Sequence, residues 1–335
     1  MFNLSESKIS LAKYKLLEKY SQFIGNKDNF PTQGIFNDAS VYKTEDKNML
    51  FSSSFFTEHI DFNLSYFPLK HLGYKIMVAS MMNILSMNGV PKQVRIDAAF
   101  SNRFTEEAID ELMSGILLYC SKFKVDFAGL DFKTSTTGLT VAASIMGEVA
   151  LGEEVYKSGA KENELICVTG DLGSAYTGLI LLEREQKVFE ADPTQQPDFI
   201  GVDYLLERYL KPEPPEKSWH PVIKPTSMLH LKDGLAAGLI QLCNASNLGC
   251  TIFEEKLPID ILTFNKLKEL NMVATTIALN GGEDYEFLFT IKQEDYKKID
   301  ESKGVSIIGY MTPKTLGKHI ITNDNKQFEL KAQGF

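Results

Sequence analysis

The chain has 335 residues, more than the ~100–200 residues of a typical domain, so we expect two domains or one large α/β unit. With 44% hydrophobic and 24% charged residues, the composition is that of an ordinary globular protein and excludes disordered and collagen-like chains. The net charge of −9 argues against general binding to nucleic acid or to an anionic membrane, because both require a surplus of Lys and Arg.

The first half of the chain alternates helix and strand signals. Helical spacing predicts three helices, at residues 9–24, 72–88 and 105–122. Strand-like patterns predict four strands, at residues 35–42, 49–55, 94–100 and 139–151. This order is typical of a mixed α/β or α+β fold.

Two units of strand, loop and helix are predicted in the second half. The strand at residues 165–169 leads into the glycine turn 170–175 and then into an apolar helix at residues 176–183. The helix N-terminus after such a turn can bind phosphate, and a plain strand-to-helix turn explains the pattern equally well. The second unit covers residues 227–242. The chain contains no P-loop, no dinucleotide-binding G-x-G-x-x-G, and no H-E-x-x-H or G-x-S-x-G motif.

Location and cysteine chemistry follow from simple features of the sequence. The N-terminal residues lack the basic and apolar regions of a signal peptide, and the longest apolar stretch, residues 76–87, is too short for a membrane span. We therefore predict a cytoplasmic protein. The four cysteines are far apart and form no C-x-x-C pair, so we expect buried free thiols rather than disulfides or a zinc site.

The most informative segment is the run N-G-G-E-D-Y-E-F at residues 280–287, which leads into a strand-like apolar run. Its glycines permit close approach of the backbone to a ligand, and acidic residues follow directly. Taken alone, the segment is also explained as a turn with solvated acidic side chains. With its G-G-E-D-Y-E signature, the sequence resembles the thiamine-monophosphate kinase family, whose superfamily includes aminoimidazole ribonucleotide synthetase and selenophosphate synthetase.

Other segments match this family's motifs in order over nearly the whole chain. The run G-I-F-N-D-A at residues 34–39 is similar to the family's G-I-G-D-D-A, and G-L-D-F-K at residues 129–133 is similar to its G-G-D-T-T. The run H-L-K-D-G-L at residues 230–235 is similar to D-I-S-D-G-L, and residues 80–89 are similar to a region with N-x-S-D. Agreement of so many ordered segments indicates membership of the family.

The resemblance implies ATP-dependent phosphorylation of thiamine monophosphate to thiamine diphosphate, with Mg²⁺ held by the motif aspartates. Phosphoryl transfer depends on positioning and on neutralising phosphate charge, so metal ions carry much of the rate. The resemblance implies that three residues are both catalytic and metal-binding: Asp38, Asp131 and Asp233. It assigns a further set to nucleotide and substrate binding: Gly34, Asn37, Asn83, Gly129, Lys133, Lys232, Gly281, Gly282, Glu283, Asp284 and Phe335.

The sequence departs from the family pattern at the metal-binding positions. Four residues stand where the family has aspartates: Asn37, Ser54, Asn83 and His230. In addition, Lys133 and Lys232 replace hydroxyl residues, and Phe36 replaces a glycine. The site should therefore be about six charge units more positive than that of the family, and a cluster of several Mg²⁺ ions is hard to hold there.

Three functions stay open on this basis. The protein is a weakened or metal-economical kinase, a noncatalytic binding or scaffold protein, or an enzyme of another phosphate reaction. Lys133, Lys232 and His230 could supply the charge that Mg²⁺ normally brings, and bind a nucleotide or another phosphorylated small molecule directly.

The resemblance also implies an architecture. It predicts two α/β domains, residues 1–151 and 152–335, in which the N-terminal sheet forms a barrel across a homodimer and the C-terminal domain has three layers. ATP is expected between the domains, near three segments: residues 34–40, 80–89 and 129–134. Phe335 would stack on the thiamine pyrimidine, or alternatively dock into the core as a hydrophobic tail.

Overall fold

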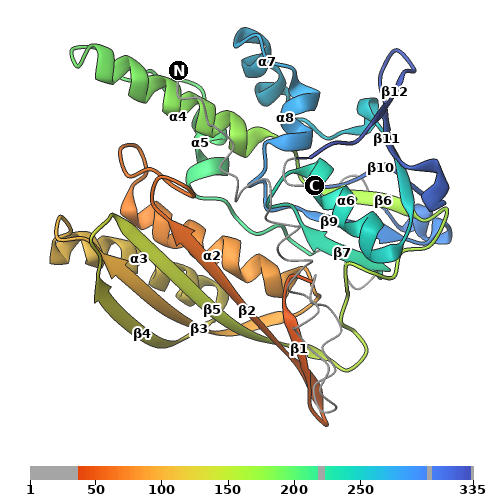
Figure 1. Cartoon of the computed structure of the whole chain (residues 1–335), viewed down its shortest axis with the longest axis horizontal. Coiled ribbons are helices and arrows are strands. Elements are labelled where there is room, and N and C mark those ends of the chain that lie inside the picture. Colours follow the sequence, from red (N-terminus) through yellow and green to blue (C-terminus); the bar gives the residue numbers. More distant parts are fainter. Residues whose placement is uncertain (1–36, 218–222, 300–303, 333–335) are drawn as a thin grey trace.

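The computed structural model describes residues 37–217, 223–299 and 304–332. The predicted helix at residues 9–24 lies outside the described residues, as do Gly34, Phe36 and Phe335, so their predicted roles stay predictions. The described chain is a mixed α/β fold with two β-sheets, as predicted, and Figure 1 shows the two sheets with their helices. The barrel across a homodimer and the three layers of the C-terminal domain stay predictions.

The first sheet has five strands in the order β1-β2-β5-β3-β4. Their bounds are β1 (Ser40–Lys43), β2 (Lys47–Thr57), β3 (Val90–Phe100), β4 (Asp126–Thr134) and β5 (Leu139–Ala150). The four strands predicted in this half of the chain are confirmed over their described residues. The edge strand β4 is not among the predicted strands, and most of its side chains are exposed.

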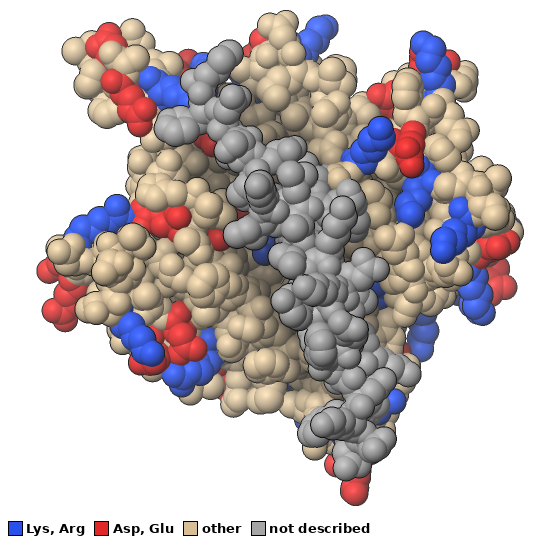
Figure 2. All heavy atoms as spheres, viewed as in Figure 1, with Lys and Arg blue, Asp and Glu red and all other residues tan. Residues whose placement is uncertain are grey.

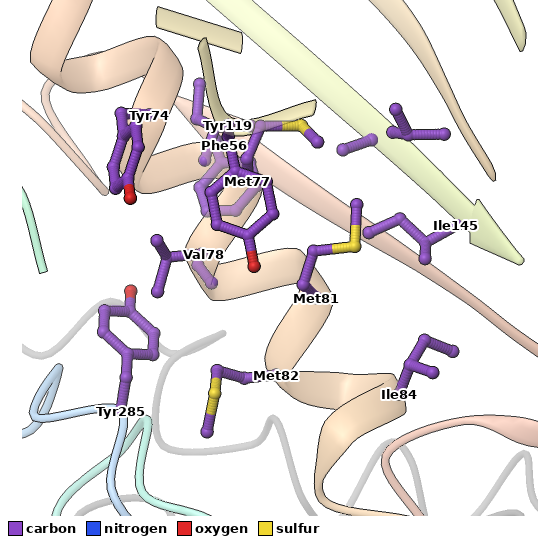
Figure 3. Packing of buried hydrophobic residues seen from close by; sticks show 14 of the residues in the cluster. Phe56, Tyr74, Met77, Val78, Met81, Met82, Ile84, Tyr119, Ile145 and Tyr285 are labelled. Carbon is purple, nitrogen blue, oxygen red and sulfur yellow. The ribbon is translucent and has the colours of Figure 1, made fainter. Parts of the chain in front are cut away.

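Two helices cover one face of this sheet, α2 (Leu69–Leu85) and α3 (Glu106–Phe123). Both confirm predicted helices. The helix α2 begins directly after Pro68, earlier than predicted, because proline can precede a helix but cannot continue a hydrogen-bonded turn. Thr105 caps α3, since its side chain accepts a hydrogen bond from the Ala108 amide. Methionines and Ile84 of α2 form the core against β2 and β5 (Figure 3).

The opposite face of the first sheet is open within the described residues. Leu50 and Val141 point toward the helices and are buried, whereas Phe51 and Phe55 point away and are 54% and 63% exposed. The strand register places Asp131 of β4 beside Asp97 of β3 on this open face, because paired residues of neighbouring strands share a face.

The second sheet has seven strands in the order β12-β11-β8-β10-β6-β9-β7. Their bounds are β6 (Leu165–Thr169), β7 (Ser227–His230), β8 (Gly249–Phe253), β9 (Phe287–Ile291), β10 (Val305–Thr312), β11 (Lys318–Ile321) and β12 (Gln327–Glu329). The helices of this part are α4 (Ser174–Ala191), α5 (Asp203–Leu210), α6 (Leu235–Ser246), α7 (Ile261–Glu269) and α8 (Ala274–Asn280). Three short 3₁₀ helices complete it: η1 (Glu254–Lys256), η2 (Gln293–Lys298) and η4 (Lys314–Leu316).

The predicted units of strand, loop and helix are confirmed as β6 with α4 and as β7 with α6. The helix α4 continues to Ala191, beyond its apolar first half, because the polar residues that follow favour helix and are solvated. One buried cluster joins the two sheets: Tyr285, which precedes β9, packs in the same core as Tyr74 and Met82 of α2 (Figure 3).

The surface charges, the cysteines and the apolar helices can be compared with the sequence analysis. On the face displayed in Figure 2, acidic and basic side chains are interspersed. All four cysteines are free and buried, as predicted. Among the described residues, every helix is too short or too polar to cross a membrane.

Candidate functional site

The signature segment 280–286 runs beside the loop that follows β7. The Glu283 amide donates to the Lys232 carbonyl oxygen at 2.8 Å, and the Tyr285 amide donates to that of Leu231 at 2.9 Å. The Leu231 amide in turn donates to the Glu286 carbonyl oxygen at 2.8 Å. Two motifs that lie far apart in the sequence are therefore joined by backbone hydrogen bonds.

The backbone of the signature segment adopts left-handed conformations. Gly282 has φ +77°, and a Cβ atom there would lie 2.6 Å from the Lys232 carbonyl oxygen. Glu283 and Tyr285 also have positive φ, at 59° and 53°. Such residues cost ~1–3 kcal/mol each and persist where the surroundings fix them. The segment is thus held in a defined conformation against the loop after β7.

Asp38, which precedes β1, lies at the centre of a buried charge cluster. Its Oδ1 atom is 2.7 Å from Lys157 Nζ, and its Oδ2 atom is 3.1 Å from His230 Nδ1. Ser86 Oγ donates to the same Oδ2 at 2.7 Å. Burial raises the pKa of Asp38, but Lys157 and His230 outweigh it and hold that pKa well below its usual range. Asp38 is therefore an ionised carboxylate whose charge the protein itself neutralises.

The four positions that depart from the family pattern are bonded to protein groups. Asn37 Oδ1 accepts from the Lys157 amide at 2.8 Å, and Asn83 Nδ2 donates to Ser54 Oγ at 3.0 Å. Ser86 links the two pairs, because its hydroxyl contacts both Asp38 and the Asn83 carbonyl oxygen. Because His230 contacts Asp38, all four replaced positions belong to one polar network.

The residues of this network do not fit a Mg²⁺ cluster. Mg²⁺ takes several oxygen ligands, mostly carboxylates and water. Both oxygens of Asp38 and the side-chain oxygens of Asn37 and Ser54 already accept from protein donors. In residues 37–217, 223–299 and 304–332, no group of three or more His, Cys, Asp or Glu side chains could hold a metal ion.

The predicted metal ligands are not brought together in the described chain. Asp131 lies on β4, which β5 and β3 separate from β2, and strands are ~4.8 Å apart, so Asp131 is about 14 Å from β2. It also points to the open face, with Gly129 and Lys133 on the same strand. Asp233 is exposed, in the loop before α6. Of the three segments predicted near ATP, residues 37–40 and 80–89 meet at the hydrogen bond from Ser86 to Asp38, whereas residues 129–134 on β4 lie away from both within one chain.

His230 and Lys232 each have a side-chain nitrogen that is not paired with a carboxylate or another acceptor of the described residues. The His230 side chain is 4% exposed and stacks at 16° on Tyr285, with ring centroids 6.5 Å apart. Its Nδ1 atom contacts Asp38, but the buried Nε2 atom has no hydrogen-bond partner among the described residues. Lys232 Nζ lies 5.9 Å from the centre of the Phe56 ring and forms no ion pair within the described chain.

Lys75 connects the first sheet's helix α2 to the signature segment. Its Nζ atom lies 2.7 Å from Glu283 Oε2 and 3.6 Å from the centre of the Tyr209 ring. Burial lowers the pKa of Lys75, and Glu283 opposes that shift. The predicted binding residue Glu283 is therefore engaged by a buried lysine. A lysine within the apolar run of α2 was the sequence signal for this pairing.

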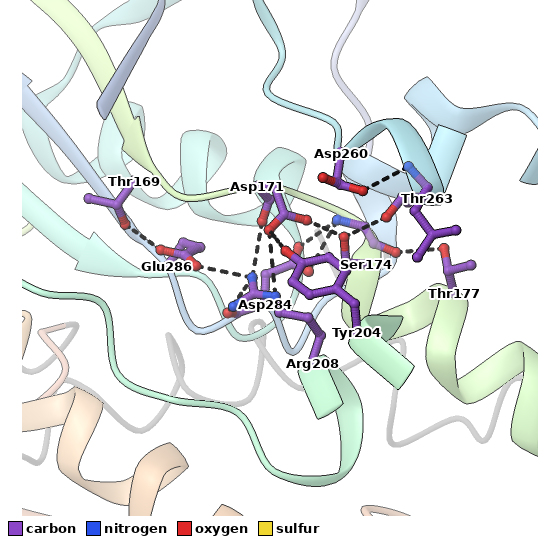
Figure 4. Close-up of polar contacts among 12 residues, drawn as sticks. Thr169, Asp171, Ser174, Thr177, Tyr204, Arg208, Asp260, Thr263, Asp284 and Glu286 are labelled. Atoms are coloured by element: carbon purple, nitrogen blue, oxygen red, sulfur yellow. Dashed lines mark hydrogen bonds and ion pairs between the residues drawn. The ribbon is translucent and has the colours of Figure 1, made fainter. Parts of the chain in front are cut away.

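The side chain of Asp284 is buried against the start of α4. It is 1% exposed, and both its carboxylate oxygens accept from the Gly173 amide at 3.1 Å, which caps the start of α4 (Figure 4). Burial raises its pKa to about 7, although Arg208 partly opposes the shift. The Gly173 amide in the turn 170–175 is therefore occupied by a carboxylate of the protein, and the predicted binding role of Asp284 stays a prediction.

Arg208 of α5 holds this buried region together and was not predicted. Its guanidinium lies 3.0 Å from Glu286 and 3.6 Å from Asp171, and donates to the carbonyl oxygens of Asp171 and Asp284. Glu286 also accepts from Thr169 at 2.6 Å. Figure 4 shows these side chains converging between β6, α4 and α5. These contacts fix Asp284 and Glu286, the last acidic residues of the signature segment, against α5 and β6.

Comparison with known proteins gives consistent relatives. The family "AIR synthase related protein, N-terminal domain" matches residues 36–149. A thiamine-monophosphate kinase of Bacillus subtilis is 28% identical over 310 residues, covering 90% of this chain and 92% of that protein. One from Buchnera aphidicola of Acyrthosiphon pisum is 27% identical, covering 96% of this chain and 98% of that protein. The solved structure of AaThiL complexed with AMPPCP and TMP shares the fold, with a TM-score of 0.82, 21% identity and coverage of 99% and 98%.

Proposed function

Since the chain carries an AIR synthase related N-terminal domain and is a homologue of thiamine-monophosphate kinases, at 24–28% identity over most of its length, we propose that it binds ATP and thiamine monophosphate, or a closely related phosphorylated molecule. The proposed reaction transfers a phosphoryl group from ATP to thiamine monophosphate, at a reduced rate. The predicted cytoplasmic location belongs to the same proposal.

The observation that carries the proposal is the contact between the signature segment and the loop after β7. Gly282 and Glu283 lie against Lys232, as two family motifs meet at one place. The complex of AaThiL with AMPPCP and TMP, which has the same fold, supports the choice of a nucleotide and a phosphorylated small molecule.

The reduced rate follows from the network around Asp38. Phosphoryl transfer needs positive charge held against the phosphate oxygens, where negative charge develops, and Mg²⁺ supplies much of it in kinases. Here Lys157 and His230 contact both oxygens of Asp38, so this carboxylate is not free to hold Mg²⁺. A second candidate, a binding protein without catalysis, is favoured by the same observation.

A homodimer is part of the proposal. The open face of the first sheet carries exposed Phe51, Phe55 and Tyr42 on neighbouring strands. Exposed aromatic side chains on an open sheet face are a common feature of surfaces that bind a partner. The same face carries Asp131 and Lys133, so a second copy seated there would meet the two predicted site residues that one chain leaves remote from Asp38.

The decisive experiment measures thiamine diphosphate formed by the purified protein from ATP and thiamine monophosphate with Mg²⁺. Slow product formation that Asp233→Asn abolishes supports the kinase. Product that the variant leaves unchanged comes from a contaminating enzyme. If micromolar protein forms no product over hours but binds either ligand by calorimetry, the binding protein replaces the kinase.

A further inference from the structure

Asp38 is held by a lysine and a histidine on its two oxygens. Lys157 contacts Oδ1 at 2.7 Å and His230 contacts Oδ2 at 3.1 Å, and the three side chains are 4–10% exposed. Lys157 Nζ also donates to Gln241 Oε1 of α6 at 3.0 Å, so it is fixed from two sides. The position of Asp38 is therefore set by contacts from the loop after β5, which carries Lys157, and from the end of β7, and α6 fixes Lys157.

A divalent ion at Asp38 would have to displace Lys157 and His230. Removing one partner from a buried ion pair is strongly unfavourable, because the other charge is left uncompensated. The neighbouring amides Asn37 and Asn83 offer no carboxylate that would offset this penalty. Occupation by Mg²⁺ is thus unfavourable, and Lys157 and His230 remain in place when a ligand binds.

One atom of this cluster still lacks a partner. His230 Nε2 is buried and makes no hydrogen bond within the described residues, although its side chain is only 4% exposed. A buried polar atom without a hydrogen bond is unfavourable, and a hydrogen bond to a ligand oxygen would remove that penalty. Lys232 follows two residues later, and α6 begins after Gly234 without a side-chain cap, so its amide end faces the same loop.

We propose that this chain binds the phosphate group of its ligand without a divalent cation. His230 Nε2 and Lys232 Nζ contact phosphate oxygens directly, and Lys157 keeps Asp38 neutralised. The inference rests on the proposed function for the ligand class, a nucleotide or thiamine phosphate. The inference goes beyond the proposed function in stating that Mg²⁺ plays no part in binding.

The test is calorimetry of the full chain with ADP and with thiamine monophosphate, each in EDTA and in Mg²⁺. We expect dissociation constants that agree within about threefold between the two conditions. Binding that requires Mg²⁺ overturns the inference and leaves the proposed function standing. Absence of binding in both conditions, by a protein that unfolds cooperatively, overturns the proposed function and the inference with it.

Variants assign the contacts. Lys232→Ala should weaken binding in EDTA by about tenfold or more, because it removes a charge-assisted hydrogen bond. The matched control is Lys256→Ala, since Lys256 also lies over a phenylalanine ring, that of Phe253 at 4.9 Å, but follows β8, which three strands separate from β7 in the second sheet. An equal loss in both variants, or none in either, contradicts the assignment.

Aspartates introduced at positions where the family has them should make ligand binding depend on Mg²⁺. With His230→Asp and Asn83→Asp combined, we expect binding in EDTA to be lost and a Mg²⁺-dependent phase to appear. Electron paramagnetic resonance of Mn²⁺ reports the ion itself: with ligand present, the unaltered protein should lower the free Mn²⁺ signal no further than the same ligand does without protein. If the unaltered protein takes up additional Mn²⁺ with its ligand, the inference is wrong, whether or not the double variant folds.

Discussion

Lys75 Nζ lies 2.7 Å from Glu283 Oε2, in an ion pair that joins helix α2 of the first sheet to the signature segment of the second. The lysine side chain is 5% exposed and the glutamate 28%. Lys75 also lies over the Tyr209 ring, so three parts of the chain meet at one ammonium group. The pair fixes the signature segment relative to α2.

Lys75→Met should therefore destabilise the protein by about 2 kcal/mol, because it leaves Glu283 without its cation in a partly buried position. Lys70→Met on the exposed side of the same helix should change the free energy of unfolding by less than about 0.5 kcal/mol. The measurement is urea unfolding. Adding Glu283→Gln to Lys75→Met should cost less than the sum of the two changes; strict additivity would show that the pair does not interact.

Gly282 and Gly152 offer a matched pair of glycines. Their φ angles are +77° and +75°, but a Cβ on Gly282 would lie 2.6 Å from the Lys232 carbonyl oxygen, whereas nothing lies within 4 Å of one on Gly152. Gly152→Ala should cost ~1 kcal/mol for the left-handed backbone alone. Gly282→Ala should cost more and weaken ligand binding, measured by unfolding and calorimetry. Equal effects would mean that the segment can move away from the loop after β7.

Asp284 should make stability depend on pH. Burial raises its pKa to about 7 in the folded protein, from 3.8. Between about pH 4 and 7 the unfolded chain loses this proton while the folded protein keeps it, so the Asp284 contribution, fully present at low pH, is lost as pH rises. Asp284→Asn cannot ionise, and its stability relative to the unaltered protein should rise by about 3 kcal/mol over this interval.

Urea unfolding across that pH range measures this difference. The same substitution at the exposed Asp110 of α3 should leave the pH profile unchanged. A constant offset between Asp284→Asn and the unaltered protein would show that Asp284 is ionised in the folded state at all these pH values, with Arg208 as its counter-ion.

Local patterns in the sequence were sufficient for most elements of the fold. The alternation in β3 and β5 and the cap at Thr105 are visible without a structure, because each depends on neighbours in the chain. The charge cluster at Asp38 could not be predicted in the same way. His230 is 192 residues away from Asp38 in the sequence, and the choice between a metal ion and a lysine as its partner depends on packing.

The resemblance to a family pointed to segments of the chain but not to the contacts of each residue. Asp284 belongs to the signature, and its carboxylate turns toward Gly173; the neighbouring Tyr285 and Glu286 are buried as well. Arg208 lies outside every motif, and only the folded chain shows that it binds Glu286.

The open face of the first sheet should mediate self-association. Phe55→Lys places a charge where the exposed phenylalanine, opposite Ala142 on the neighbouring strand, would meet a second copy. We expect the unaltered protein to sediment as a dimer and the variant as a monomer, because an unpaired charge buried in an apolar interface costs several kcal/mol. Ile200→Lys is the control, since Ile200 is 92% exposed but lies outside that sheet. A dimer that survives Phe55→Lys, or an unaltered protein that is monomeric at micromolar concentration, would rule out this face as the interface.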